Sequence, residues 1–195
     1  MHDLPDIDID LADRSQLLAL IKHVPACQFD SQRGRVKHNT GVYTVDIPVH
    51  GLDALSTYDY KQAEQLGYFK LDLLNVGVYT LVKDSAHLQQ LLAREPDWSQ
   101  LWLDPEFSEK IIHINRYPAL LKHMKPDSVT RMAAFISIIR PGKAHLQHRP
   151  WDEVFATVWD GDSSKGYTFK RAHAISYAML VKVHINVLQE QMCRE

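Results

Sequence analysis

Acidic and apolar residues alternate near the N-terminus, between Leu4 and Leu11. Side chains two positions apart share one face of an extended strand. The alternation therefore predicts a strand with an acidic face, formed by Asp6, Asp8 and Asp10, and an apolar face. Clustered carboxylates repel one another, and a hard divalent cation such as Mg²⁺ is a common reason for such a cluster. An exposed strand whose acids face water is the alternative interpretation of the same pattern.

The composition is that of an ordinary globular protein, with 195 residues, 45% of them apolar and 24% charged. The formal net charge of −2 gives no overall attraction for nucleic acid, so such binding would depend on local basic clusters. The two cysteines, Cys27 and Cys193, indicate neither a disulfide framework nor a thiolate zinc site, which fits a cytoplasmic protein. No signal peptide or membrane-spanning segment is expected.

Hydrophobic periodicity predicts alternating strands and helices in the first half of the chain. Beyond the acidic strand we expect a helix at about 14–24, a strand at 41–49, a helix at about 60–66 that ends at Gly67, and a strand at 69–74. On this last strand Lys70 and Asp72 share one face, two positions apart. The chain is thus a mixed α/β, or α+β, protein.

The second half is predicted to be mainly helical. Ser85 would cap a segment through Arg94, and residues 95–105 would form a connection. Further expectations are a helix capped by Asp127 or Ser128 that stops at Arg140, and a final helix at about 171–191 with an apolar face formed by Ile175, Met179, Val183 and Val187. We place the boundary between a sheet-containing region, 1–84, and a helical region, 85–195.

Five segments, taken in order, carry a resemblance to a known family. They are Leu4 to Asp10 followed by Asp13-Arg14, Lys37-His38-Asn39-Thr40-Gly41-Val42, Tyr58 to Leu74 with Lys70-Leu71-Asp72, Lys125 to Gly142 with Arg140-Pro141-Gly142, and Gly166 to His173 with Tyr177. In this order they resemble the C-family replicative DNA polymerases, typified by the bacterial DNA polymerase III alpha subunit. Any one of these segments alone would be a weak signal.

The resemblance implies a polymerase-beta-like nucleotidyltransferase palm with a mixed sheet in 1–84, and a helical partial fingers region in 85–195 packed on it. The catalytic residues would be Asp6, Asp8 and Asp72, which would bind two Mg²⁺ ions, or Mn²⁺ in their place. Asp10 would be a further metal ligand, although one branch of the family has Asn at this position.

The resemblance also implies binding residues for the substrates, a dNTP and primer-template DNA. The nucleotide would contact Lys70, Arg171, His173 and Tyr177, and the DNA would contact Arg35, Lys37, His38, Arg140 and Lys143. The alternatives are an ordinary exposed lysine at position 70 and a structural His173–Tyr177 pair on the final helix.

Departures from the family pattern leave more than one function open. Family members carry a histidinol-phosphatase-like domain and a triphosphate-binding Gly-Ser motif before the first acidic motif, and we expect both to be missing because Leu4 is so near Met1. One possibility is a miniature or split DNA-directed DNA polymerase, of a kind a phage could encode, whose triphosphate-binding motif is replaced locally or comes from a partner polypeptide. A second is a noncatalytic palm-derived module that binds DNA or a replication protein. A Mg²⁺-dependent nuclease or phosphatase is a third, but it leaves the ordered fingers segments unexplained.

Overall fold

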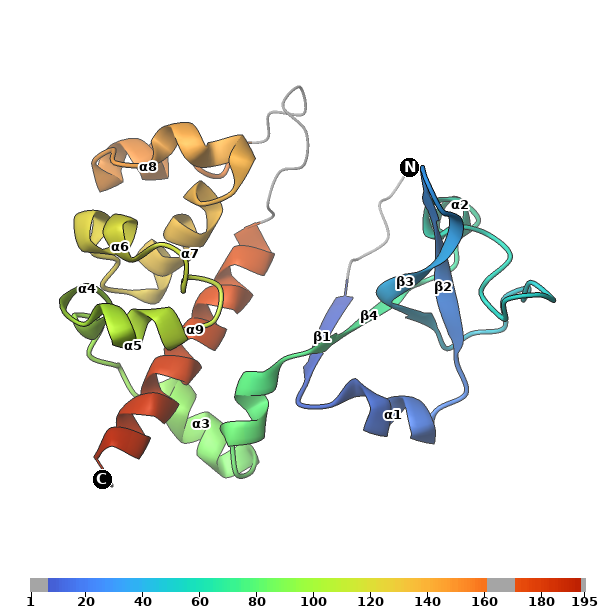
Figure 1. Cartoon of the computed structure of the whole chain (residues 1–195), viewed down its shortest axis with the longest axis horizontal. Coiled ribbons are helices and arrows are strands. Elements are labelled where there is room, and N and C mark those ends of the chain that lie inside the picture. The colour runs from blue at the N-terminus through green and yellow to red at the C-terminus, as the bar shows by residue number, and fades with distance from the viewer. Residues whose placement is uncertain (1–6, 161–170, 194–195) are drawn as a thin grey trace. The chain divides into compact units, whose positions relative to one another are not determined.

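A four-stranded mixed sheet lies in the first of two compact units of the chain. The computed structural model describes residues 7–160 and 171–193, and the chain divides into Met1–Thr80, here called the sheet unit, and Leu81–Glu195, the helical unit (Figure 1). Together the two units make a mixed α+β protein, as the sequence predicts. Asp6 and the segment 161–170 lie outside the described residues, so the structure does not test the predictions made for them.

The sheet has the strand order β1-β4-β3-β2. Its strands are β1 Ile7–Leu11, β2 Val24–Asp30, β3 Gly34–Tyr43 and β4 Leu71–Asn75. β1 and β4 are parallel, whereas β4 with β3 and β3 with β2 are antiparallel. The first and last strands of the unit in sequence are therefore neighbours, and this brings the N-terminal acidic strand beside the strand of Asp72.

Two short helices and a 3₁₀ turn complete the sheet unit. They are α1 Arg14–Leu20, α2 Tyr60–Gln65 and η1 Gly77–Leu81. Asp13 and Asp59 cap α1 and α2, since their side chains accept hydrogen bonds from backbone N–H groups of the first turn. Gly67 follows α2 with φ of +84°, a left-handed conformation that favours glycine.

The core of the sheet unit lies between α2 and one face of the sheet. Ala26, Tyr43, Ile47 and Ala63 are buried there, with Tyr68 packed edge-on against Tyr43. Alternation along β3 puts Gly41 on the same face as Tyr43. The face that α2 partly covers is therefore also the face of Gly41.

The helical unit is organised around two helices that pack on each other, α7 and α9. Its elements are α3 Ser85–Ala93, α4 Gln100–Leu103, α5 Pro105–Lys110, α6 Pro118–Met124, α7 Val129–Ile138, η2 Pro141–Leu146, α8 Trp151–Thr157 and α9 Arg171–Met192. Every residue of α7 from Met132 to Ile138 is buried, so this helix is the centre of the unit. Its largest fully buried side chains include Phe135 and Met132.

Several local predictions need correction. The helix predicted at 14–24 ends at Leu20, because Val24 already pairs with Tyr43 in the β2–β3 hairpin. The strand predicted at 41–49 begins earlier and covers Gly34–Tyr43 instead. Asp84, not Ser85, caps α3, because the Asp84 carboxylate accepts the His87 N–H.

The apolar face predicted for the final helix is also only partly right. Val183 and Val187 are buried, but Ile175 is 41% exposed. The buried positions instead begin with Ala174 and Ala178, whose small side chains let α9 approach α7 closely. Small residues at a helix contact carry little hydrophobic signal in the sequence, which is why the pattern pointed to a different face.

Candidate metal and nucleotide site

Three residues on three neighbouring strands form a row across the sheet. Asp8 of β1 is the register partner of Asp72 of β4, and Asp72 is the register partner of Gly41 of β3. Register partners on adjacent strands project on the same face of a sheet. The two carboxylates therefore lie on one face, on neighbouring strands, and Gly41 adds no side chain to the row.

Both carboxylate oxygens of Asp72 have a partner in the sheet unit. The Thr40 hydroxyl donates to Oδ1 at 2.7 Å, and the Lys70 ammonium contacts Oδ2 directly. The Asp72 and Lys70 side chains are only 12% and 17% exposed, so water screens this ion pair little. Lys70 is thus the counter-ion of Asp72.

His38 also faces Asp72, but as a neutral ring. Its Nδ1 accepts the Gly41 N–H at 2.9 Å and lies 3.8 Å from Oδ1 of Asp72. Burial, and then the nearby Lys70 charge, lower the pKa of His38. Because Nδ1 accepts a hydrogen bond, its approach to Asp72 is not an ion pair. The ring also packs edge-on against Tyr60 at the start of α2, with the ring centroids 5.3 Å apart.

Gly41 is the residue that lets these side chains come together. A Cβ atom at this position would lie 2.8 Å from Cδ of Lys70, 2.9 Å from Nδ1 of His38 and 3.1 Å from Cβ of Ala26. These distances are shorter than ordinary contacts, so any side chain would displace the lysine or the imidazole. The His-x-x-Gly spacing of the sequence thus has a steric reason.

Arg14 supports the site from the start of α1. Its guanidinium donates to the carbonyl groups of Asn39 on β3 and Leu73 on β4, just past the residues that pair these two strands with each other. Its backbone N–H donates to Oδ1 of Asn75 at 2.7 Å. Arg14 thereby connects the end of β1 to the two strands that carry Thr40 and Asp72.

Asp10 adds a third described acid on the same face of β1 as Asp8, two positions along. Burial, and then the Asp8 charge, raise the pKa of Asp10. A divalent cation would relieve the repulsion between Asp8 and Asp10. Within 7–160 and 171–193, however, no three His, Cys, Asp or Glu side chains form a group arranged to bind one ion.

The residues predicted to contact nucleotide lie in both units. Lys70 is beside Asp72, whereas Arg171, His173 and Tyr177 are on α9 of the helical unit. Tyr177 stacks on His113, with ring centroids 4.3 Å apart and planes 10° apart, and Arg171 lies over the Trp159 ring. Each of these contacts lies within the helical unit.

The residues predicted to contact DNA have different surroundings. Arg35 contacts Asp53 and donates to the Ser56 and Thr57 carbonyls, so it holds the loop that precedes α2. Lys143 donates to the carbonyls of Thr157 and Asp160 at the end of α8.

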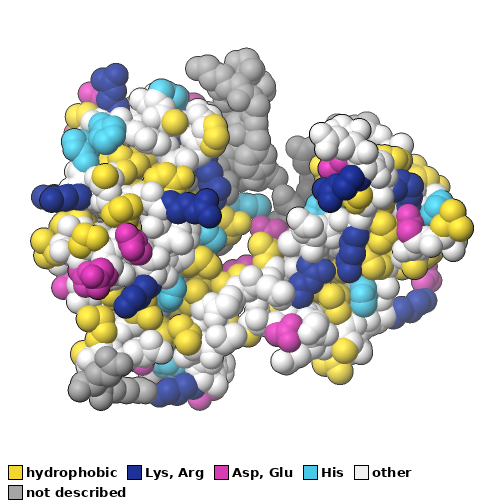
Figure 2. All heavy atoms as spheres, in the orientation of Figure 1, with side chains coloured by type: hydrophobic (Ala, Val, Ile, Leu, Met, Phe, Trp, Pro, Cys, Tyr) yellow, Lys and Arg dark blue, Asp and Glu magenta, His cyan; other side chains and the backbone are white. Residues whose placement is uncertain are grey.

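Of the others, Lys37 and Arg140 are exposed, and His38 belongs to the Asp72 cluster. On the face shown in Figure 2, basic side chains lie among acidic and apolar ones rather than in one continuous basic surface.

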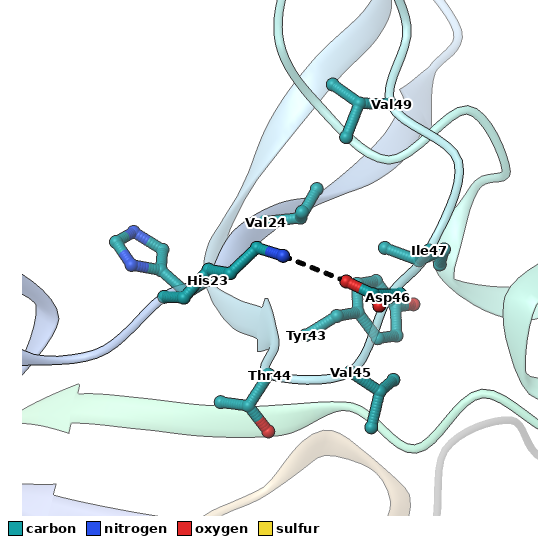
Figure 3. A pocket seen from close by; sticks show the side chains of 9 residues that line it. His23, Val24, Tyr43, Thr44, Val45, Asp46, Ile47 and Val49 are labelled. Atoms are coloured by element: carbon teal, nitrogen blue, oxygen red, sulfur yellow. Dashed lines mark hydrogen bonds and ion pairs between the residues drawn. The ribbon is translucent and has the colours of Figure 1, made fainter.

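A small pocket of about 150 Å³ lies elsewhere in the sheet unit (Figure 3). Tyr43, Ile47 and Val49 form part of its wall, and the Lys22–Asp46 ion pair lies beside it. Both partners of this pair are about 90% exposed or more, so the pair contributes little to stability. Neither Asp8 nor Asp72 lines this pocket.

Sequence reasoning did not identify Thr40, Gly41, Arg14 or Tyr60 as parts of the site. Thr40 and Gly41 lie within the Lys37 to Val42 segment that carries part of the family resemblance, so the His-x-x-Gly spacing was a usable signal. Arg14 and Tyr60 reach the site only through tertiary contacts.

Comparison of the chain with models of protein families, with curated proteins and with solved structures found no match. Among the described residues, no helix combines the length and the apolar character needed to cross a membrane.

Proposed function

We propose that the chain is a DNA-polymerase-like nucleotidyltransferase of DNA replication, which transfers a nucleotide to a primer 3′ hydroxyl. The observation that carries the proposal is the register of Asp8 with Asp72 on adjacent parallel strands. The ordered resemblance to the C-family polymerases supports it, and the polymerase-beta-like palm remains part of the proposal.

The residues of the row fit a divalent cation by their chemistry. Carboxylate oxygens are the ligands that Mg²⁺ prefers, and Mn²⁺ accepts them as well. Asp8 and Asp72 would hold the ions together with Asp10, and with Asp6, which lies outside the described residues. Two bound ions supply activation of the 3′ hydroxyl and neutralisation of the triphosphate and of the leaving pyrophosphate.

The chain's own residues would prepare Asp72 for this role. Thr40 fixes the orientation of the carboxylate, and Lys70 provides a positive charge beside it. The neutral His38 holds the Gly41 N–H and adds no charge. Arg171, His173 and Tyr177 would contact the nucleotide, with Tyr177 offering a ring on which a base can stack.

The proposal includes two further partners. Primer-template DNA would bind through Lys37 and Arg140, with Arg35, His38 and Lys143 nearby in the sequence. The affinity of the chain for DNA would fall as the salt concentration rises. The triphosphate-binding motif that precedes the palm in C-family enzymes would be replaced locally or supplied by a partner polypeptide.

Primer extension by the full chain, with Mg²⁺ or Mn²⁺, tests the proposal. The wild type should extend a labelled primer, and Asp8→Asn or Asp72→Asn should each reduce the rate by more than about a hundredfold. Asp46→Asn is the matched control, because Asp46 is an exposed acid of the same unit. No extension by the wild type, or full activity of the Asp72 variant, would exclude catalysis by this chain alone.

The Lys70–Asp72 ion pair favours a second candidate, a noncatalytic palm-derived module that binds DNA or a replication protein. In such a module Lys70 would neutralise Asp72 permanently, and no cation would be needed. Thermal unfolding with dATP, in the presence and absence of Mg²⁺, separates the two, since a metal that binds the native state raises the melting temperature. An unchanged melting temperature, together with no primer extension, would favour the module.

A further inference from the structure

The ion pair of Lys70 and Asp72 has a consequence for the order in which ligands bind. One carboxylate oxygen of Asp72 accepts the Thr40 hydroxyl and the other contacts the Lys70 ammonium. A cation that approaches Asp72 therefore meets a positive charge already at that carboxylate. Because both side chains are largely shielded from water, the repulsion is screened less than it would be at the surface.

The position of Lys70 is set by the packing of its hydrocarbon stem. Its Cδ lies in the space that a side chain at position 41 would fill. The stem is therefore held against the backbone of β3, while the ammonium at its end remains a compact charge on a flexible chain. A small rotation near the end of the side chain moves the charge without disturbing the stem.

We propose that Lys70 couples nucleoside triphosphate binding to divalent cation binding at Asp72. Without nucleotide, the ammonium occupies the Asp72 carboxylate and keeps the affinity for cation low. A triphosphate draws the ammonium to its own oxygens and leaves Asp72 uncompensated and ready for the cation. This inference rests on the proposed function, because it assigns the triphosphate to the same face as the row.

The coupling has to be reciprocal. If nucleotide raises the affinity for cation, then cation raises the affinity for nucleotide by the same factor. The chain would keep Asp72 neutralised by Lys70 until a triphosphate is bound. A carboxylate whose counter-ion was only structural would instead show the same cation affinity with and without nucleotide.

Mn²⁺ binding to the full chain, followed by electron paramagnetic resonance in the absence of nucleotide, tests the proposal. Lys70→Met keeps the stem but removes the charge, and it should bind Mn²⁺ about tenfold more tightly than the wild type. Lys70→Arg should keep the weak binding of the wild type. Lys22→Met is the matched control, since Lys22 is also paired with an aspartate but its side chain is 89% exposed, and the Mn²⁺ binding of this variant should not change.

The double variant Lys70→Met with Asp72→Asn shows whether the gain occurs at Asp72. It should lose the increased affinity and return to the wild-type level or below. Equal or weaker Mn²⁺ binding by Lys70→Met would overturn the coupling, as would a gain that survives in the double variant.

A second measurement uses the wild type alone and so does not depend on how the variants fold. The NMR signal of the Lys70 side-chain Cε should shift when Mg²⁺ and dATP are added together, and Mg²⁺ alone at the same concentration should leave it in place. No shift with dATP, or an equal shift with Mg²⁺ alone, contradicts the proposal. Primer extension reports on the proposed function separately: if these binding results hold and no primer is extended, the coupling stands and the polymerase activity fails.

Discussion

Gly41 lies directly opposite Asp72 in the β3–β4 pair, and the space beside its Cα is filled by the Lys70 side chain and the His38 ring. The strand needs no unusual backbone conformation at this glycine. Glycine is needed at position 41 for space, because the Lys70 side chain and the His38 ring approach the backbone from the face that carries Asp72. The composition of the site thus depends on a residue that contributes no functional group.

Gly41→Ala should destabilise the sheet unit. The new Cβ would lie 2.8 Å from Cδ of Lys70, and overpacking of this kind costs about 1–3 kcal/mol. Urea unfolding measures the loss. Gly51→Ala is the matched control, since no atom lies within 4 Å of a Cβ built there, and its free energy of unfolding should stay within about 0.5 kcal/mol of the wild type. Equal effects of the two substitutions would show that space at Gly41 is not limiting.

His113 should make the helical unit less stable as the pH falls. Burial, and then the Arg140 charge, lower the pKa of His113 from its ordinary value of 6.5 to about 4. Between these values the unfolded chain binds a proton that the native state excludes, so stability is complete above pH 6.5 and decreases toward pH 4. With allowance for the partial exposure of the ring, the loss is about 1–2 kcal/mol.

Urea unfolding between pH 7 and pH 4 measures this effect, with His113→Asn as the comparison. Asparagine tolerates the left-handed backbone at this position, where φ is +69°, but it does not titrate. The variant should lose about 1–2 kcal/mol less than the wild type over this range. A His113 NMR titration with a midpoint near 6.5 would refute the expectation.

Asn186 should be among the most sensitive positions of the helical unit. It is fully buried on α9, and its side-chain amide donates to the Leu91 and Arg94 carbonyls at the end of α3. Its Oδ1 also accepts from the Arg94 guanidinium. Asn186→Leu, which is similar in shape, leaves these groups unpaired and should cost about 3 kcal/mol or more in thermal unfolding. Gln191→Leu, on the exposed end of the same helix, should cost less than about 0.5 kcal/mol.

Local patterns in the sequence predicted the strands that carry Asp8 and Asp72, and placed Lys70 on the face of Asp72. They could not determine the pairing of β1 with β4, because neither segment specifies its neighbour and their register depends on contacts between distant parts of the chain. That adjacency was expected only from the family resemblance. The β2–β3 hairpin is not predicted for a local reason: the helical pattern continues to Val24, and Pro25, a residue type that commonly follows the end of a helix, lies within β2.

The tertiary contacts of each candidate residue were harder to predict than the strand or helix on which it lies. His38 was grouped with the basic residues around it, yet the Gly41 N–H and the edge of Tyr60 make it a neutral part of the Asp72 cluster. Similarly, the stacking of Tyr177 on His113 joins residues from distant segments of the helical unit. Such contacts follow from tertiary packing, which a single sequence does not specify.

Thr40→Val should separate the orientation of Asp72 from its charge. Valine keeps the shape of threonine but removes the hydroxyl that donates to Asp72 at 2.7 Å, at a cost of about 1–2 kcal/mol in unfolding. If Asp72 binds a cation, loss of this hydrogen bond should also weaken Mn²⁺ binding by about tenfold, because partners that orient a ligand contribute to metal affinity. Thr40→Ser retains the hydroxyl and should bind Mn²⁺ like the wild type. Weaker binding by the serine variant, or unchanged binding by the valine variant, would mean that the hydroxyl does not prepare Asp72 for a cation.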